Sequence, residues 1–148
     1  MPLLRDDILA PIPGDNPGGQ DLRYAPVYDK IKEARKEDDD LSQGVWQSER
    51  KVADHILAIK LIQEAIAKQS KDLQLAAWLT ESLLKKHGFE GLLEGLDLCR
   101  GMIETFWEHL YPELDEDDAE FRAAPLEWVG GKFEFPVKNV AVCQAGYD

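Results

Sequence analysis

Cysteine is scarce in this chain, since only Cys99 and Cys143 occur among its 148 residues. Two cysteines cannot build the disulfide framework of a small secreted domain, and they do not have the spacing of a metal site. We therefore expect both to act as small apolar side chains in a reducing compartment, the cytoplasm.

Long apolar runs are also lacking: none approaches the roughly 20 residues that span a bilayer. The N-terminal residues carry acids where a signal peptide needs an apolar core.

Basic residues are also scarce relative to acidic ones. The chain has 17 lysines and arginines against 29 aspartates and glutamates, which gives a formal net charge of −12. A surface this acidic repels phosphate backbones and anionic lipids. We therefore expect neither nucleic acid nor a membrane surface as a direct partner, and the charge indicates either solubility or a protein partner with a basic patch.

Catalytic and ligand-binding motifs are missing as well. The sequence has no HExxH helix, no Gly-x-Ser-x-Gly elbow and no phosphate loop ending in Gly-Lys-Ser/Thr. His87 with Glu90, and Asp54 with His55, are pairs that could ligate a metal, but a metal site needs three or four convergent ligands. We therefore predict no metal and no cofactor.

One enzyme hypothesis remains open at this stage. Scattered carboxylates, at Asp54, Glu104 and Glu108, could form a site with His55 if the fold brought them into one cleft with perturbed pKa values. The competing interpretation is that Glu104 and Glu108, one helical turn apart, lie on a solvated face. We favour that interpretation and predict that the protein is not an enzyme.

The most informative stretch runs from Lys71 to Pro112. It predicts two long helices broken at His87-Gly88, where a glycine follows basic residues in the manner of a helix C-terminal cap, and Pro112 should end the second helix. Either Ser70 or Asp72 should cap the first helix. The apolar stripe of the second helix comprises Phe89, Leu92, Leu93, Leu96, Cys99, Ile103, Phe106, Trp107 and Leu110.

Further helices are predicted around this hairpin. One begins after Pro26 and runs from Val27 to about Lys36; another spans residues 51–69, and a short one follows the acidic run at 115–118 and ends at Gly130-Gly131. The inward face of the 51–69 helix should hold Val52, Ile56, Ile59, Ile62 and Ile66.

The fold class is therefore all-α, an irregular helical bundle around a central buried helical hairpin. We expect a single domain over residues 1–148. Residues 1–25, rich in proline and glycine, should form an extended lead-in across the bundle surface. Residues 26–129 should form the bundle, and residues 130–148 an irregular tail or a small edge hairpin.

Three ordered motifs carry a resemblance to a known family. They are PIPGDNPGGQDLRYAPVYDKIKEA (Pro11 to Ala34), KDLQLAAWLTESLLKKHGFEGLLEGLDLC (Lys71 to Cys99) and FWEHLYPELDEDDAEFRAAPLEW (Phe106 to Trp128). Together they resemble the ImpA-related N-terminal domain that TssA-family proteins of the bacterial type VI secretion system carry. The sequence departs from the family at Asp54-His55, where family members often have an Asp-Trp pair.

The resemblance implies a non-enzymatic assembly or scaffolding role in the contractile secretion apparatus. The implied partners are baseplate, sheath or tube proteins, met from the cytoplasm. Family members generally continue into variable C-terminal domains that drive ring assembly, so we expect this chain by itself to be a monomer or weak dimer. The alternative is a free-standing acidic adaptor or chaperone-like bundle unrelated to secretion.

Exposed aromatic residues are the candidate partner-binding residues, because aromatic anchors dominate interface energetics. Trp46 lies in a loop-like segment, and Phe133 and Phe135 lie in the tail. The competing interpretation is that all three pack back on the core, as large aromatics mostly do.

Overall fold

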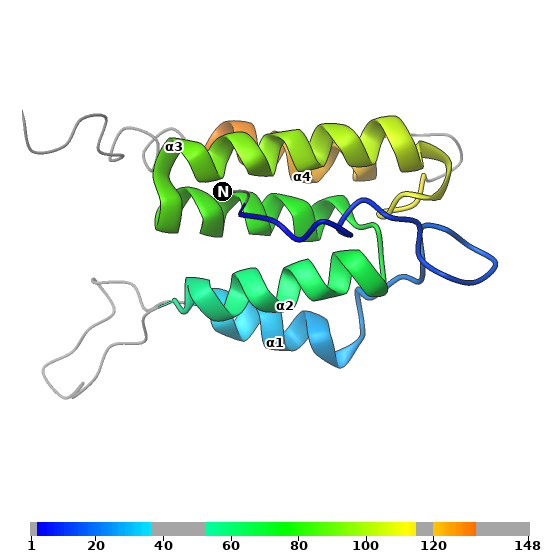
Figure 1. Cartoon of the computed structure of the whole chain (residues 1–148), viewed down its shortest axis with the longest axis horizontal. Coiled ribbons are helices and arrows are strands. Elements are labelled where there is room, and N and C mark those ends of the chain that lie inside the picture. The colour runs from blue at the N-terminus through cyan, green and yellow to red at the C-terminus, as the bar shows by residue number, and fades with distance from the viewer. Residues whose placement is uncertain (1–2, 37–52, 115–119, 133–148) are drawn as a thin grey trace, which may run out of the picture.

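The computed structural model describes residues 3–36, 53–114 and 120–132 of the chain. Within these ranges the secondary structure is helical, with two isolated β-bridges and no strand (Figure 1). The predicted all-α bundle is confirmed. The helices are α1 (Pro26–Arg35), α2 (His55–Lys68), α3 (Leu73–Phe106), the short 3-10 helix η2 (Trp107–His109) and α4 (Glu120–Lys132).

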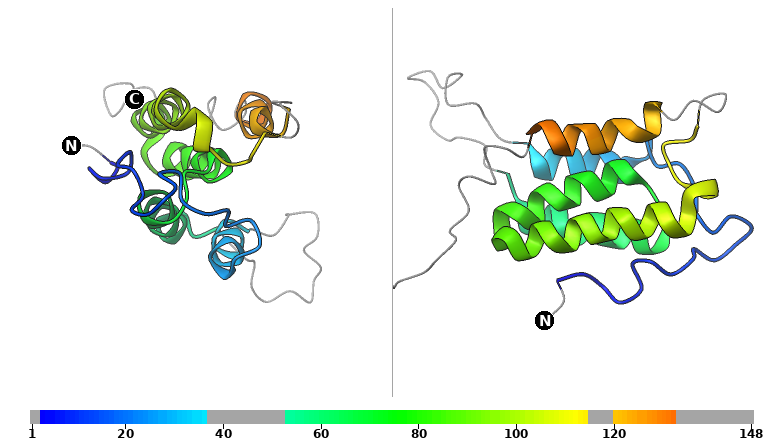
Figure 2. Two further views of the ribbon diagram at one scale, coloured as in Figure 1. Left: turned by 90° about the vertical axis from the view of Figure 1, so that its right-hand side faces the viewer. Right: turned by 90° about the horizontal axis from the view of Figure 1, so that it is seen from above.

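Helix α3 folds back on itself at Gly88, which has a φ of 67° and a ψ of −143°. Glycine adopts this left-handed φ without a steric penalty, so the predicted break is confirmed. We call residues 73–87 the inner arm and residues 89–106 the outer arm. Figure 2 shows the inner arm at the centre of the bundle, surrounded by the outer arm, α2 and α4.

The end of the hairpin differs from the prediction. The α-helix stops at Phe106, a 3-10 turn follows, and Pro112 lies beyond both. Tyr111, which precedes Pro112, instead pairs with the start of α3: its amide donates to the Lys71 carbonyl at 2.9 Å, and its carbonyl accepts from the Leu73 amide at 2.8 Å. The chain therefore leaves the helix early in order to hydrogen-bond to the beginning of α3.

The two arms meet through small residues. Gly91 and Gly95 are buried, and a Cβ atom at either position would collide with the inner arm, at the Leu83 carbonyl and at Thr80 respectively. The outer arm buries Leu98, Cys99, Met102 and Phe106 on the same side.

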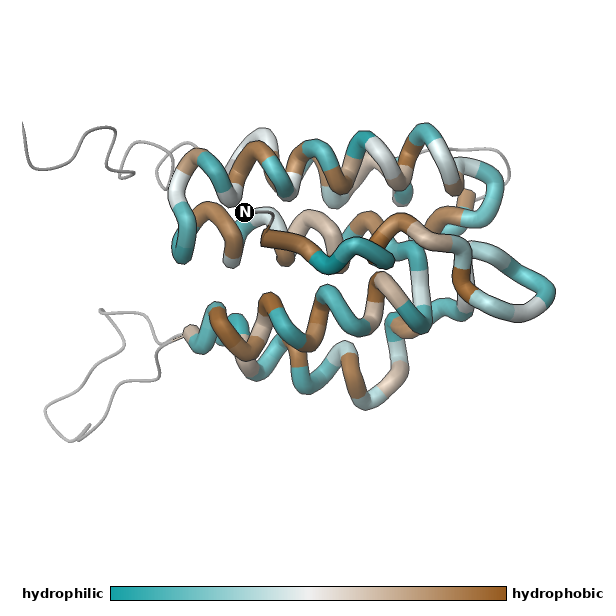
Figure 3. Tube along the Cα trace, in the orientation of Figure 1, coloured by the Kyte–Doolittle hydropathy of each residue, from teal (hydrophilic) through white to brown (hydrophobic). Residues whose placement is uncertain are grey.

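Part of the predicted stripe of the outer arm is consequently wrong. The glycines occupy the inward face, and four of the stripe's large side chains are turned outward. Their exposed fractions are 43% for Phe89, 60% for Leu93, 44% for Leu96 and 40% for Trp107. Figure 3 shows that hydrophobic residues recur along the outer arm as well as along the inner one.

Helix α1 begins at Pro26 and buries Tyr28, Ile31 and Ala34. Helix α2 begins at His55, later than predicted, because the Asp54 side chain caps it by accepting from the Leu57 amide at 3.0 Å. Its buried face is rich in alanine, which lets it lie close to α3, and Ile56 is therefore 66% exposed and not inward as predicted. Val52 is outside the described residues. The buried residues of α2 are Ala58, Ile62, Ala65, Ile66 and Ala67.

The lead-in from residue 3 to residue 25 follows a series of turns along the bundle. Ile8, Ile12 and Leu22 are buried, and the Leu3 amide donates to the Glu94 carboxylate on the outer arm at 2.9 Å. Close contact at Gly19 leaves no space for a Cβ atom beside the Gln69 carbonyl, and Gly19 also forms an antiparallel bridge with Ser70.

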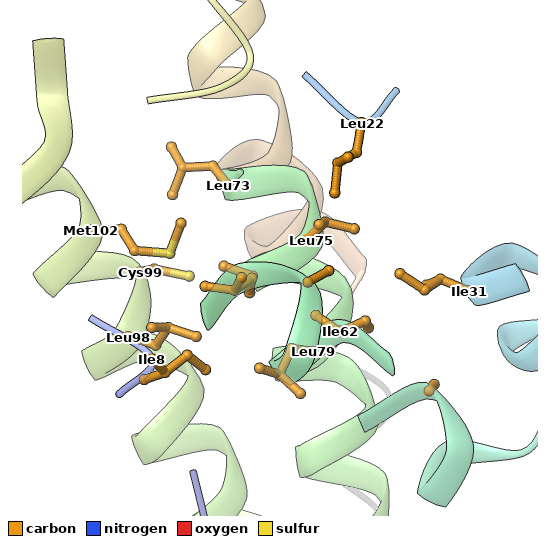
Figure 4. Packing of buried hydrophobic residues seen from close by; sticks show 14 of the residues in the cluster. Ile8, Leu22, Ile31, Ile62, Leu73, Leu75, Leu79, Leu98, Cys99 and Met102 are labelled. Atoms are coloured by element: carbon orange, nitrogen blue, oxygen red, sulfur yellow. The ribbon is translucent and has the colours of Figure 1, made fainter. Parts of the chain in front are cut away.

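One core joins the lead-in, α1, α2 and both arms of α3 (Figure 4). The predicted apolar role of Cys99 is confirmed, since its side chain lies in this core, where burial raises the pKa of the thiol. A smaller cluster, Ala77, Leu84 and Val129, attaches α4 to the inner arm.

Candidate functional site

A cleft of about 490 Å³ lies between α1, the start of α3 and α4. Its lining mixes aromatic rings with side chains of both charges. The lining residues are Asp21, Arg23, Tyr28, Lys32, Asp72, Gln74, Trp78, Tyr111, Pro112, Glu113, Ala124 and Pro125.

A buried hydrogen-bonded pair lines this cleft. The Tyr28 hydroxyl donates to Asp72 Oδ2 at 2.7 Å, and Asp72 Oδ1 accepts from the Gln74 amide at 2.8 Å. Burial raises the pKa of the Asp72 carboxyl, and burial together with the neighbouring Asp72 raises the pKa of the Tyr28 hydroxyl. Both Asp72 oxygens are engaged in capping α3 and holding Tyr28, so this carboxylate positions structure and is not placed as a free general base.

Arg122 of α4 holds the chain that follows the outer arm. Its guanidinium is buried and donates to three backbone carbonyls: that of Trp107 at 2.6 Å, of Leu110 at 2.6 Å and of Pro112 at 3.0 Å. The same group lies 4.6 Å from the centre of the Trp107 ring. Desolvation lowers the pKa of Arg122, and the three carbonyls replace water at three of its five N–H donors. This arginine therefore fixes α4 to the wall of the cleft.

Lys71 is a second buried cation, with an exposed fraction of 0%. Its ammonium donates to the Ile8 carbonyl at 2.8 Å and to the Ile66 carbonyl at 2.7 Å, and lies 5.3 Å from the centre of the Phe106 ring. Desolvation lowers the pKa of Lys71 to about 8. Lys71 thus connects the lead-in to the end of α2 and to the core.

Arg35 joins three helices beside the cleft. Its guanidinium pairs with the Glu81 carboxylate at 3.0 Å and lies over the rings of Trp78 and Trp128, at 4.6 and 5.5 Å from their centres. Trp78 in turn packs against Tyr28, with ring centres 5.3 Å apart. The aromatic residues of the cleft are therefore held in place by α1, α3 and α4 together.

The predicted partner-binding residues Trp46, Phe133 and Phe135 lie outside the described residues. The structure therefore does not test whether they contact a partner or pack on the core.

The hypothetical carboxylate site does not form. Asp54 caps α2, and His55 Nδ1 lies 2.9 Å from the Ser82 hydroxyl. Glu104 pairs with Arg100 on the exposed side of the outer arm, and Glu108 is also exposed. Helix α2 begins at one end of the bundle and α3 ends at the other, so these groups do not share a cleft (Figure 1).

Over the described ranges 3–36, 53–114 and 120–132, no three His, Cys, Asp or Glu side chains converge in a way that could hold a metal ion. No described helix combines the length and apolar character that crossing a membrane requires.

Sequence reasoning missed the roles of Lys71, Arg122 and the pair formed by Tyr28 and Asp72. Each of the two cations binds backbone carbonyls, which carry no side-chain signature. The only sequence signal for Lys71 and Arg122 was that they lie in the motifs Lys71 to Cys99 and Phe106 to Trp128. Membership of a motif indicates that a residue matters but not what it contacts.

Comparison with known proteins identifies relatives. Residues 9–131 match the family model described as "ImpA, N-terminal, type VI secretion system". The chain is 30% identical over 119 residues to the type VI secretion system component TssA1 of Pseudomonas aeruginosa, an alignment that covers 75% of this chain and 32% of that protein. The chain thus spans about a third of this curated relative.

A solved structure is similar over the whole chain. It is the N-terminal domain, including the ImpA_N region, of the TssA component of the type VI secretion system from Burkholderia cenocepacia. The TM-score is 0.83 at 30% sequence identity, and the match covers 100% of this chain and 55% of that one.

Proposed function

The chain belongs to the ImpA N-terminal family of the type VI secretion system, and we propose that it is a non-enzymatic docking module that helps to assemble the secretion apparatus. The observation that carries the proposal is the family match over residues 9–131, joined by the likeness to two TssA components. The partners would be baseplate, sheath or tube proteins, and the docking would take place in the cytoplasm.

The contacts of the buried polar groups support a role based on shape. Lys71 and Arg122 donate to backbone carbonyls, and Asp72 caps a helix. The hydrogen bonds of these groups therefore hold segments of the chain together. Reactive groups of an enzyme would need to face a substrate. A rigid arrangement of helices is what a docking module needs in order to present one surface without reorganising on binding.

The chemistry of the partner follows from charge. A chain with a net charge of −12 attracts basic surfaces and repels acidic ones, so we propose that the docked protein presents a basic patch. Trp46, Phe133 and Phe135 remain our candidate aromatic anchors. We propose that residues 1–148 by themselves form a monomer or weak dimer, which light scattering on the purified chain measures; a stable ring would contradict this.

The experiment is a pull-down from lysate of the host bacterium with this chain as bait, read by mass spectrometry. We expect baseplate, sheath or tube proteins to be recovered. The variant Trp46→Ala and the double variant Phe133→Ala/Phe135→Ala should recover less of them. The control Tyr24→Ala removes a ring that is 88% exposed on the lead-in and should change nothing.

Two results would contradict the proposal. If the wild-type chain recovers no secretion protein, it does not dock by itself. If it recovers a reproducible set of proteins outside the secretion apparatus, the free-standing adaptor is the better description. Equal recovery by all variants would leave docking intact but remove the three aromatic residues from the contact.

A further inference from the structure

The outer arm of α3 carries an apolar seam on its solvent side. The seam consists of Phe89, Leu93, Leu96 and Ile103, spaced alternately by three and four residues if Arg100 is counted as the missing position. Three of the four side chains are at least 43% exposed, and Ile103 is half-buried. Alternating spacing of this kind is the heptad pattern by which one helix packs along another.

An acidic row runs beside the seam. Glu90, Asp97 and Glu104 follow one another at intervals of seven residues and are all exposed. In heptad terms they occupy one of the two positions that flank a seam and set partner choice by charge. The opposite flank holds Leu92, Cys99 and Phe106, which face the bundle. The seam is therefore apolar, open to solvent and bordered by negative charge on its free side.

We propose that this seam docks one amphipathic helix of a partner protein, whose apolar face is flanked by lysine and arginine. The proposal rests on the docking function proposed above and names the surface and the kind of partner. The seam runs for about 21 Å at the usual rise of an α-helix, enough for about four turns of a partner helix. Apolar residues would fill the seam, and basic residues would lie over the acidic row.

Arg100 is compatible with such a contact although it lies within the seam. Its guanidinium pairs with Glu104 at 2.9 Å, and both side chains are exposed, at 74% and 62%. The pair can remain at the edge of the contact with its charges partly in water, because the long arginine side chain reaches outward. Docking therefore does not strand an uncompensated charge.

A second copy of this chain fits the seam poorly. Two antiparallel outer arms would place one acidic row against the other, and like charges that face each other at an interface are unfavourable. The net charge of −12 on each copy adds to the repulsion. A basic helix removes both difficulties, which is why charge selects a different protein as the occupant.

The test uses three variants of the full chain and the pull-down described above. The seam variant is Leu93→Gln/Leu96→Gln, and the charge variant is Glu90→Lys/Asp97→Lys/Glu104→Lys. The control variant, Glu33→Lys/Glu64→Lys/Glu127→Lys, changes exposed acids on α1, α2 and α4 and reaches the same net charge as the charge variant. All substituted residues are exposed, so circular dichroism should show unchanged helix content in each variant.

We expect the recovered partner to fall about a hundredfold with the seam variant, about tenfold with the charge variant and less than about twofold with the control. A photo-crosslinking residue in place of Leu93, used in the host bacterium, should join the chain to one segment of the partner. That segment should have apolar residues at spacings of three and four with lysine or arginine beside them.

Several outcomes would contradict the proposal that the seam docks a basic amphipathic helix. They are an absence of crosslinks, crosslinks to a second copy or to the same polypeptide, and crosslinks to a segment without the basic heptad pattern. An equal loss of partner in the charge and control variants would show that only net charge matters. If all variants recover secretion proteins as the wild type does, docking stands and the surface is wrong, whereas a wild type that recovers none refutes docking itself.

Discussion

The two arms of α3 are joined at Gly88 and pack side by side, but they place their apolar residues differently. The inner arm is buried on nearly all sides, and its leucines, among them Leu75, Leu79 and Leu83, form the centre of the core. The outer arm buries Gly91 and Gly95 at its closest approach and exposes Leu93 and Leu96, although it also buries Leu98. Burial in this bundle is therefore decided by how near two helices come, and residue size matters as much as hydrophobicity.

The difference between the two arms is tested most directly by truncating one leucine on each arm. Leu79→Ala should lower the free energy of unfolding by about 3 kcal/mol, because it leaves a cavity in the core. Leu93→Ala, the same change on the outer arm, should alter it by less than about 0.5 kcal/mol. Urea denaturation followed by circular dichroism measures both values. Equal losses would mean that the outer seam is a structural contact.

The anchor at the end of the outer arm gives the next largest effect. Arg122→Met removes a guanidinium that satisfies three backbone carbonyls and should cost about 2–3 kcal/mol. Arg122→Lys should recover only part of this loss, since a lysine cannot reproduce the planar fork of donors. The exposed Arg23→Lys serves as the control. Denaturation curves that coincide for all these proteins would contradict the role assigned to Arg122.

A smaller change sharpens the contact between the arms. Gly95→Ala should destabilise the protein by about 1–2 kcal/mol, because the new Cβ meets the side chain and Cα of Thr80, and this outweighs the higher helix propensity of alanine. Gly101→Ala should be neutral or stabilising, because its Cβ meets only the end of the flexible, partly exposed Leu9 side chain. A lower melting temperature for Gly101→Ala than for Gly95→Ala would contradict a close contact between the arms at Gly95.

The smallest effect concerns pH. The pKa of Lys71 is lowered to about 8 from its usual 10.5, so the unfolded chain binds this proton more tightly than the folded chain does. Between pH 8 and pH 10.5, deprotonation therefore relieves a cost of folding, and stability should rise with pH. Taken in full, this lowering of the pKa is worth about 3 kcal/mol. The gain should be smaller, on the order of 1 kcal/mol, because the carbonyls of Ile8 and Ile66 accept hydrogen bonds from the ammonium and so stabilise the charged form.

The control for this prediction is Lys71→Met, which has no charge to lose. Other groups titrate in the same range, so the quantity to compare is the difference in unfolding free energy between wild type and variant at each pH. That difference should move in favour of the wild type as pH rises from 8 to 10.5. A constant difference would contradict the lowered pKa of Lys71.

The starts of α1 and α3 and the break in α3 could be predicted from the sequence because single residues decide them, whereas the start of α2 was placed too early. Pro26 opens α1, Asp72 caps α3, and Gly88 turns it back. The inward face of α2 and of the outer arm could be predicted only in part: Ile62, Ile66, Cys99 and Phe106 are buried as predicted. Periodicity follows large apolar residues, whereas the close contacts belong to residues such as Ala58 and Gly95.

The cleft was harder still to predict. Tyr28, Asp72 and Tyr111 are separated by long stretches of sequence, and only the completed fold brings them together. Lys71 was unrecognised as a core residue because a lysine is normally exposed, and only its two carbonyl acceptors make its burial possible. Residue type alone does not reveal which main-chain oxygens lie within reach.

The two buried cations have a consequence for how freely this sequence can change. All the hydrogen bonds described for Lys71 and Arg122 go to main-chain oxygens, and every amino acid supplies such an oxygen. The part-exposed Trp107 can therefore exchange its side chain without removing the acceptor that it offers to Arg122, at the loss of the ring contact alone. The molecule can in this way acquire new surface chemistry, and so new partners, while the internal bonds that set its shape are inherited unchanged.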